Sequence, residues 1–163
     1  MLENTFGGSG YDIACAQNAQ PIVYQRQNST PLIKIVDFDP PFKDQLFFVH
    51  RNQKQNSREA IARYNTLKTT QTLDFSALNA ITEALLVATT LEEFEVLISK
   101  HENLVGALIQ HPPLKTTHFA DYPGAIKSLG AWGGDFFLAT RRNTQYFKDK
   151  GYNTILAFGE ILL

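Results

Sequence analysis

Two adjacent prolines, Pro40 and Pro41, impose the strongest constraint on how this chain folds. Proline lacks a backbone N–H and has a fixed φ, so a pair of prolines does not lie inside a central strand. They stand in DFDPPF (37–42), between two sets of strand-like segments. We therefore expect a boundary near residue 43, with one part over residues 1–44 and another over 45–163.

The first part is predicted to hold a short helix and a hairpin. DIACAQNA (12–19) follows a glycine-rich turn and is typical of a short helix with Asp12 near its start. PIVYQ (21–25) and LIKIVDF (32–38) are rich in β-branched and aromatic residues and are separated by RQNST (26–30). This arrangement favours two paired strands.

The second part is predicted to alternate strands with helices. Capping boxes and apolar residues at helical spacing indicate the helices, and a loop is expected after Pro112 and Pro113. The expected elements are a strand at 45–50, helices at 56–67, 75–88 and 90–108, strands within 124–129 and 136–140, a helix at 143–151 and a final strand at 153–162. This β-α-β-β-α-β order predicts an α+β fold with a ferredoxin-like split unit and an enlarged first helical crossover.

Composition excludes several classes of partner. The formal net charge of −1 argues against a nucleic-acid-binding surface, which normally carries a basic excess. No apolar stretch approaches the length that spans a bilayer, and the N-terminus lacks the pattern of a signal peptide, so no membrane partner is expected. The one cysteine, Cys15, excludes an internal disulfide and fits the reducing cytoplasm; we expect it to be a small buried hydrophobe.

Two glycine clusters carry the functional argument. GGSG (7–10) precedes Asp12, and GAWGGD (130–135) follows far along the chain; each alone could be an ordinary turn. A carboxylate in the first turn of a helix is also favoured by the helix dipole in any protein. Together, however, GSGYD and KSLGAWGGDFFLAT resemble the GHMP superfamily of small-molecule kinases, and GSGYDIA looks like its GYDIA-type subfamily, which is similar to mevalonate and phosphomevalonate kinases.

The resemblance implies a ferredoxin-like C-terminal domain at 45–163, and a remnant of the N-terminal domain at 1–44. It implies that Asp12 is the catalytic carboxylate, and that ATP and Mg²⁺ serve the intact enzyme, which phosphorylates a hydroxyl or phosphate of a small metabolite such as mevalonate or phosphomevalonate. The implied substrate contacts are Ser9, Gly10, Tyr11, Lys54 and Ser57. The implied phosphate and glycine loop comprises Lys127, Gly130, Ala131, Gly133, Gly134 and Asp135.

This chain departs from the family pattern at two points. Trp132 stands where the family has another glycine, and no GLGSSA-like phosphate-binding loop occurs anywhere in the sequence. We therefore expect a fragment, the C-terminal part of such a kinase, which is inactive alone and does not bind nucleotide tightly.

Plainer interpretations stay open. Lys54 and Ser57 fit helix capping with a solvated charge, Lys127 fits a solvated strand edge, and Asp135 fits a turn-ending hydrogen bond. The four histidines lack metal-site spacing, so no metal site is predicted. The chain as a whole could instead be a non-catalytic α/β module that binds a metabolite or forms a homo-oligomer through exposed apolar surface of residues 1–44. A ferredoxin-like regulatory domain unrelated to kinases is a third hypothesis.

Overall fold

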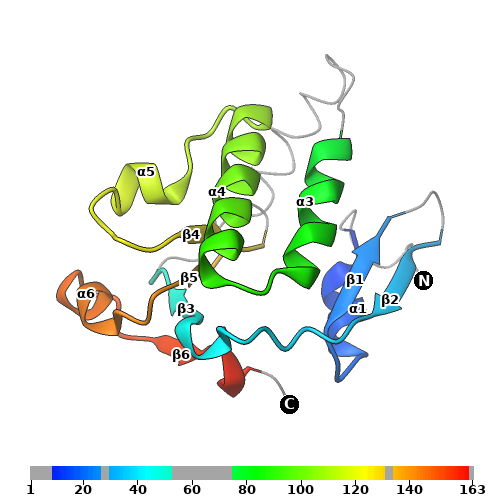
Figure 1. Cartoon of the computed structure of the whole chain (residues 1–163), viewed down its shortest axis with the longest axis horizontal. Helices are drawn as coiled ribbons and strands as arrows, with labels where there is room; N and C mark the ends of the chain where they lie inside the picture. The colour runs from blue at the N-terminus through cyan, green and yellow to red at the C-terminus, as the bar shows by residue number, and fades with distance from the viewer. Residues whose placement is uncertain (1–8, 27–29, 53–74, 131–133, 162–163) are drawn as a thin grey trace. The chain divides into compact units, whose positions relative to one another are not determined.

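The computed structural model describes residues 9–26, 30–52, 75–130 and 134–161 of the chain. These residues divide into two compact units, Met1–Asp39 with Glu160–Leu163, and Pro40–Gly159. The helix expected at 56–67 lies outside the described residues. Each unit is described by itself below, with the element labels of Figure 1.

The first unit consists of a short helix and a hairpin, as predicted. In the hairpin the two strands pair antiparallel, with Ile22 opposite Ile35 and Gln25 opposite Leu32. Every residue of the second strand is exposed, including the apolar side chains of Leu32, Ile33 and Ile35. The elements of this unit are α1 (Tyr11–Ala16), β1 (Ile22–Gln25) and β2 (Leu32–Ile35).

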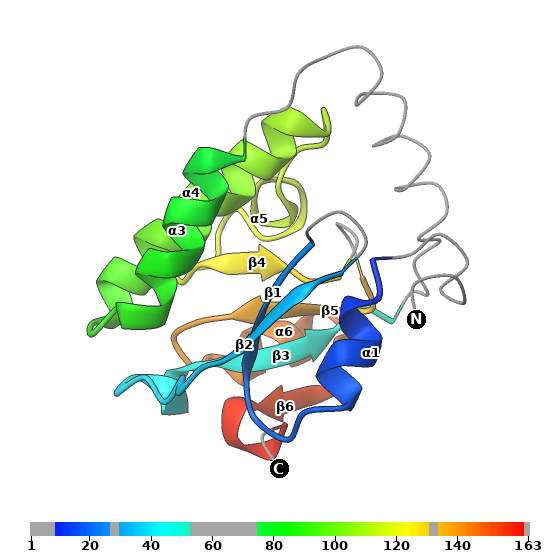
Figure 2. The ribbon, with the colours of Figure 1, turned by 90° about the vertical axis from the view of Figure 1, so that its right-hand side faces the viewer.

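The second unit is built on a four-stranded antiparallel sheet in the order β4-β5-β3-β6. Figure 2 shows the four strands side by side in this order. The first and last strands of this sheet in chain order, β3 and β6, are neighbours, and β5 lies between β3 and β4. This is the split β-α-β pattern, so the predicted ferredoxin-like α+β fold is confirmed. The strands are β3 (Phe47–His50), β4 (Ile126–Ser128), β5 (Phe136–Ala139) and β6 (Ile155–Ala157).

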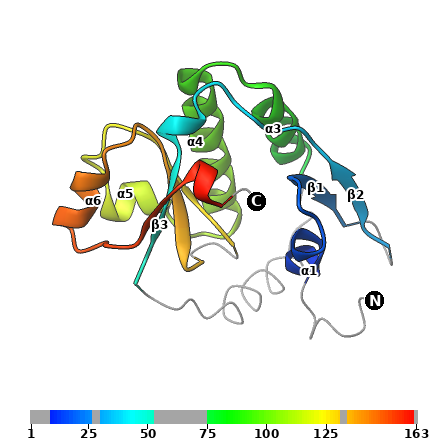
Figure 3. The same ribbon diagram turned by 90° about the horizontal axis from the view of Figure 1, so that it is seen from below.

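Aromatic side chains form the core of this unit on one face of the sheet. Phe137 and Phe147 are fully buried there, with their ring centroids 5.5 Å apart, and Phe119 packs against both. Phe119 and Phe147 come from the segments of α5 (Leu114–His118) and α6 (Thr144–Asp149), which Figure 3 places on the same side of the sheet.

Two longer helices, α3 (Ser76–Val87) and α4 (Leu91–Leu108), pack on each other and match the expected positions. The Thr90 hydroxyl accepts the Glu93 N–H at 3.2 Å, which caps α4. The Glu93 carboxylate accepts the N–H of Thr89 instead of that of Thr90, so only half of the expected capping box forms. The helix that begins at this cap packs against β4.

Two sequence expectations in the second unit were wrong. The segment after Pro113 contains the short helix α5 instead of only a loop, because Pro113 is compatible with the start of a helix. The final strand ends at Ala157, well before residue 162. The Phe158 N–H still donates to the Leu46 carbonyl at 3.1 Å, in register with the pair of Phe47 and Ala157, and the chain then turns into a 3₁₀ helix over Phe158–Glu160.

Within the described residues, none of the helices combines the length and apolar character that crossing a membrane requires.

Candidate functional site

Asp12 is presented on the surface of the first unit. The helix α1 begins after Gly10, whose φ of 78° lies in the left-handed region that glycine adopts without strain. The carboxylate of Asp12 is exposed in the first turn, where the helix dipole favours negative charge. The structure therefore places Asp12 near the start of a helix that follows the glycine-rich turn, as the sequence predicted, while its catalytic role stays a prediction.

Two tyrosines hold the segment that leads into α1. The Tyr24 hydroxyl donates to the Ser9 carbonyl at 2.5 Å, and the Tyr11 N–H donates to the Ser9 hydroxyl at 3.4 Å. The rings of Tyr11 and Tyr24 meet edge to face, with centroids 6.5 Å apart. Partial burial, followed by the charges of Cys15 and Asp12, raises the pKa of Tyr11, so its hydroxyl stays protonated at neutral pH. The four expected residues from Ser9 to Asp12 thus lie next to one another, and contacts with Tyr24 hold this segment in place.

The second glycine segment is closed at its base. Gly130 has φ of 66°, and the Gly134 N–H donates to the Leu129 carbonyl at 2.9 Å. A Cβ on Gly134 would lie 2.5 Å from that carbonyl oxygen, so the turn excludes any side chain at Gly134. The carbonyl of the exposed Asp135 accepts the Arg51 N–H at 2.7 Å. The segment therefore joins the end of β4 to the ends of β5 and β3.

Lys127 on β4 lies against α4. Its ammonium is 3.5 Å from the buried Glu102 carboxylate and 3.3 Å from His101 Nδ1, and Ser128 donates to the other Glu102 oxygen at 2.8 Å. Burial lowers the pKa of Lys127, against the opposing effect of Glu102. Burial and the Lys127 charge lower the pKa of His101 to about 4. The solvated strand edge considered from sequence is therefore wrong for Lys127, which is partly buried and paired; its role in a phosphate loop stays a prediction.

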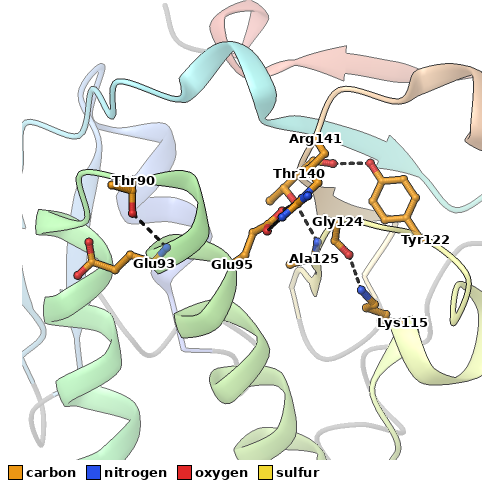
Figure 4. Close-up of polar contacts among 9 residues, drawn as sticks. All are labelled: Thr90, Glu93, Glu95, Lys115, Tyr122, Gly124, Ala125, Thr140 and Arg141. Atoms are coloured by element: carbon orange, nitrogen blue, oxygen red, sulfur yellow. Dashed lines mark hydrogen bonds and ion pairs between the residues drawn. The ribbon is translucent and has the colours of Figure 1, made fainter.

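Sequence reasoning missed a second buried carboxylate, Glu95, which lies about two turns before Glu102 on α4. Figure 4 shows it between α4 and the end of β5. The Thr140 hydroxyl donates to Glu95 Oε1 at 2.5 Å, and Arg141 binds both carboxylate oxygens, with Nη2 2.7 Å from Oε2. Burial alone would raise the pKa of Glu95, but the hydrogen bonds from Arg141 and Thr140 outweigh it and hold the pKa below its ordinary value.

The Glu95 cluster also fixes the start of β4. Thr140 Oγ1 accepts the Ala125 N–H at 2.8 Å, and the Tyr122 hydroxyl donates to the Thr140 carbonyl. A Cβ on Gly124 would lie 2.7 Å from Thr140 Oγ1, so glycine is required at this close approach. Lys115 donates to the Gly124 carbonyl at 2.5 Å (Figure 4). The network holds the start of β4, and the glycine segment follows the end of this short strand.

One sequence signal could have found both carboxylates. Glu95 and Glu102 fall on the same helical face as the buried Phe94, Ile98 and Val105 of α4. A carboxylate on the apolar face of a helix indicates a buried pair or network, because an isolated buried charge is too costly.

The expected site residues fall into three groups. Ser9, Gly10, Tyr11 and Asp12 lie in the first unit, and Lys127, Gly130, Gly134 and Asp135 lie together in the second. Lys54, Ser57, Ala131 and Gly133 lie outside the described residues, as does Trp132. Cys15 is exposed, so its predicted burial was wrong; in α1 only Ala14 is buried. Across the described ranges, no three His, Cys, Asp or Glu side chains are grouped so that they could hold a metal ion.

Comparison of the sequence with known protein families and with curated proteins finds no match. Comparison of the structure with solved structures does find matches. The mevalonate kinase of L. major, solved in complex with R-mevalonate, matches with a TM-score of 0.62 and 18% identity over 89% of this chain and 47% of that chain. The fold is like that of a mevalonate kinase. The Lin0012 protein of Listeria innocua matches with a TM-score of 0.51 and 14% identity over 73% of this chain and 37% of that chain.

The match to the mevalonate kinase includes residues of both units. Pro40–Gly159 makes up less than three quarters of the chain, whereas the match covers 89% of it. The chain spans about half the length of the mevalonate kinase that it matches. At this identity the likeness is one of fold alone.

Proposed function

We propose that this chain is the C-terminal part of a GHMP-type kinase that phosphorylates a hydroxyl or phosphate of a small metabolite. The observation that carries the proposal is the mevalonate kinase fold over 89% of the chain. The two glycine segments that resemble the family motifs lie within this fold, one before α1 and one between β4 and β5. Mevalonate and phosphomevalonate are the best substrate candidates, since the matched kinase was solved with R-mevalonate.

Asp12 is the residue to which we assign the chemistry. In phosphoryl transfer the substrate oxygen attacks the γ-phosphorus, the bond to the leaving nucleoside diphosphate breaks, and the hydroxyl proton needs an acceptor. An exposed carboxylate in the first turn of α1 can accept that proton or orient the hydroxyl. Ser9 and Tyr11, which flank the same surface, are proposed to contact the substrate.

The residues of this chain fit a nucleotide and Mg²⁺ only in part. The Gly134 N–H is already used by the Leu129 carbonyl and so is not offered to a phosphate. Gly130 has no Cβ to keep an anion away from the backbone, and Asp135 is exposed beside it. ATP supplies the phosphoryl group when it is bound, and we propose that tight binding needs residues beyond those of this chain. Saturable, tight binding of Mg·ATP to the 163 residues in calorimetry would show that this part of the proposal is wrong.

Asp12→Asn in the full-length protein tests the catalytic assignment. We expect turnover to fall by at least about 10²-fold, because the amide cannot accept the proton. Asp37→Asn is the matched control, since Asp37 is also exposed in the first unit. Both variants should keep the far-UV circular dichroism spectrum of the native protein, which shows that the fold is unchanged. Near-normal turnover of Asp12→Asn would remove Asp12 from the mechanism.

A second candidate is a non-catalytic module that associates with itself. The exposed apolar side chains of β2 favour it, with Leu32 52% and Ile35 55% exposed. A full-length protein without phosphotransferase activity, whose sedimentation mass rises with concentration, would favour this candidate over the kinase.

A further inference from the structure

The buried carboxylate of Glu102 on α4 holds the end of β4. Only 6% of Glu102 is exposed. Its Oε2 accepts the Ser128 hydroxyl at 2.8 Å, and its Oε1 lies 3.5 Å from the Lys127 ammonium. Lys127 and Ser128 are the last two residues of β4, which spans Ile126–Ser128 and leads toward the second glycine segment. One side chain of α4 therefore contacts both residues at the end of this strand.

The Lys127 ammonium is surrounded by acceptors of the second unit. Besides contacting Glu102, it donates to the Ser128 carbonyl at 3.3 Å and lies 3.3 Å from His101 Nδ1. An ammonium has three N–H donors, so each donor has an acceptor in this cluster. Burial lowers the pKa of Lys127, and the Glu102 carboxylate opposes this effect. Glu102 therefore supplies the counter-charge that a partly buried lysine requires.

A second carboxylate of the same helix holds the other end of β4. Glu95 accepts the Thr140 hydroxyl, which in turn accepts the N–H of Ala125, the residue before β4 (Figure 4). Glu95 and Glu102 are seven residues apart on α4, which is about 10.5 Å along a helix. Ala125 and Ser128 are three residues apart, which is about 10 Å along a strand. The spacing of the two carboxylates on α4 thus matches the length of β4.

β4 depends on α4 because it is a short edge strand. Among the described strands it pairs with β5 alone, and α4 packs against it. The chain then turns at Leu129, whose carbonyl accepts the Gly134 N–H at 2.9 Å, and Gly130 has φ of 66°. Since this closing bond starts one residue after Ser128, the position of the glycine segment follows from the end of β4.

We propose that Glu102 is a positioning residue, which sets through Ser128 and Lys127 the place where the second glycine segment leaves the sheet. It acts through these two neighbours and is not assigned a contact with the substrate. Phosphoryl transfer depends on the placement of the groups around the phosphates. A fixed end of β4 holds Gly130 and Gly134 in one arrangement for that reaction. The use of the segment in phosphoryl transfer rests on the proposed function, whereas the contacts of Glu102 do not.

Hydrogen exchange of the Gly134 amide, followed by NMR on the 163-residue chain, tests the role of Glu102. Ser128→Ala removes the hydrogen bond to the carboxylate, so the protection of this amide should fall at least about tenfold. The reason is that opening of the segment has to release Ser128 if Glu102 holds it. A carboxylate that merely stabilised the unit would lower the protection of the β3 amides, which exchange through opening of the whole unit. It would leave the local opening at Gly134 unchanged.

Ser128→Thr is the matched control, because threonine keeps the hydroxyl and favours a strand, and it should keep the native protection of Gly134. Glu102→Gln should also lower this protection, since it leaves Lys127 without its counter-charge. Glu83→Gln, at an exposed position of α3, should not. Unchanged Gly134 protection in Ser128→Ala, a loss confined to the β3 amides, or an equal loss in Ser128→Thr would each overturn the proposal.

Kinetics of the full-length protein test the use of the segment in the reaction. In Ser128→Ala, kcat/KM for Mg·ATP should fall at least about tenfold, because a displacement of about 1 Å in a positioning group is costly. Ser128→Thr should restore the native value. A native kcat/KM in Ser128→Ala of an active kinase would overturn this use of the segment. A full-length protein without phosphotransferase activity would contradict the proposed function, and the exchange of Gly134 would still decide the role of Glu102.

Discussion

Replacing Thr140 with valine should test the buried network that fixes the start of β4. Thr140 is fully buried, and its hydroxyl makes two bonds at once. It donates to Glu95 Oε1 at 2.5 Å and accepts the Ala125 N–H at 2.8 Å. Valine keeps the shape of the side chain but makes neither bond. The Ala125 N–H then loses its Thr140 acceptor, and Glu95 keeps Arg141 and the backbone of Ala125 as partners.

The expected cost can be worked out from the two lost bonds. A hydrogen bond to a charged group contributes about 1.5–3 kcal/mol, and the neutral bond from the Ala125 N–H contributes about 0.5–1.5 kcal/mol. The added methyl group offsets part of this loss, because it fills the space of the hydroxyl. We therefore expect Thr140→Val to lower the free energy of unfolding of the second unit by about 2–4 kcal/mol. This is a large share of the stability of a domain of ordinary size.

Native-state hydrogen exchange is the suitable assay, because the chain holds two units and a single unfolding transition is not assured. The amides of β3 and β5 report the free energy of opening of the second unit alone. Thr116→Val is the matched control, since Thr116 is exposed on α5, and its effect should stay within about 0.5 kcal/mol. In a Glu95→Gln background Thr140→Val should cost less, because the two residues are coupled. A cost no larger than that of Thr116→Val would refute the assignment of the network.

Two further predictions concern the same unit. Gly124→Ala should destabilise it by about 1–3 kcal/mol, because the new Cβ would lie 2.7 Å from Thr140 Oγ1, whereas Gly159→Ala, which meets nothing within 4 Å, should not. His101 has a pKa of about 4 in the fold and 6.5 when unfolded, so the unfolded state binds its proton first and stability should fall as the pH drops from 6.5 to 4. The charged groups around His101 are Lys127 of β4, which faces the ring, and Glu102, its neighbour on α4. His101→Gln should reduce the loss of unfolding free energy between pH 7 and pH 4.5 by about 1 kcal/mol, a value that allows for the partial exposure of the ring. Urea unfolding at the two pH values measures this difference. Equal pH dependence of native and variant proteins would contradict this explanation.

The order of the elements in the second unit was predictable because its signals are local. Apolar spacing and the Thr90 cap specify α4, and the Asn143 side chain caps α6 by accepting the Tyr146 N–H. The strand content of β3 and β5 follows from runs of phenylalanine and β-branched residues. The early end of β6 was missed because Phe158, where the 3₁₀ turn begins, is held by contacts with Leu46 and Phe48, which are far away in the chain. The short α5 was missed because the two prolines before it were taken to indicate a loop.

In the candidate site, too, the features set by local signals were predictable and those set by distant residues were not. The glycine requirement at Gly10 follows from a local positive φ, and the sequence alone placed Asp12 in the first turn of a helix. The Glu95 and Glu102 clusters were not predicted, because the partners of these carboxylates lie 25 to 46 residues away in the chain.

Among the described residues, the sequence by itself indicated the helices and strands apart from α5 and the end of β6, and it indicated where glycine and proline interrupt them. Each such choice depends on backbone geometry and on neighbours within a turn or two of the chain. Only the tertiary structure decided that two carboxylates of α4 are buried and paired. A charged side chain is stable inside a protein only where distant residues supply its partners, and their positions exist only once the chain has folded.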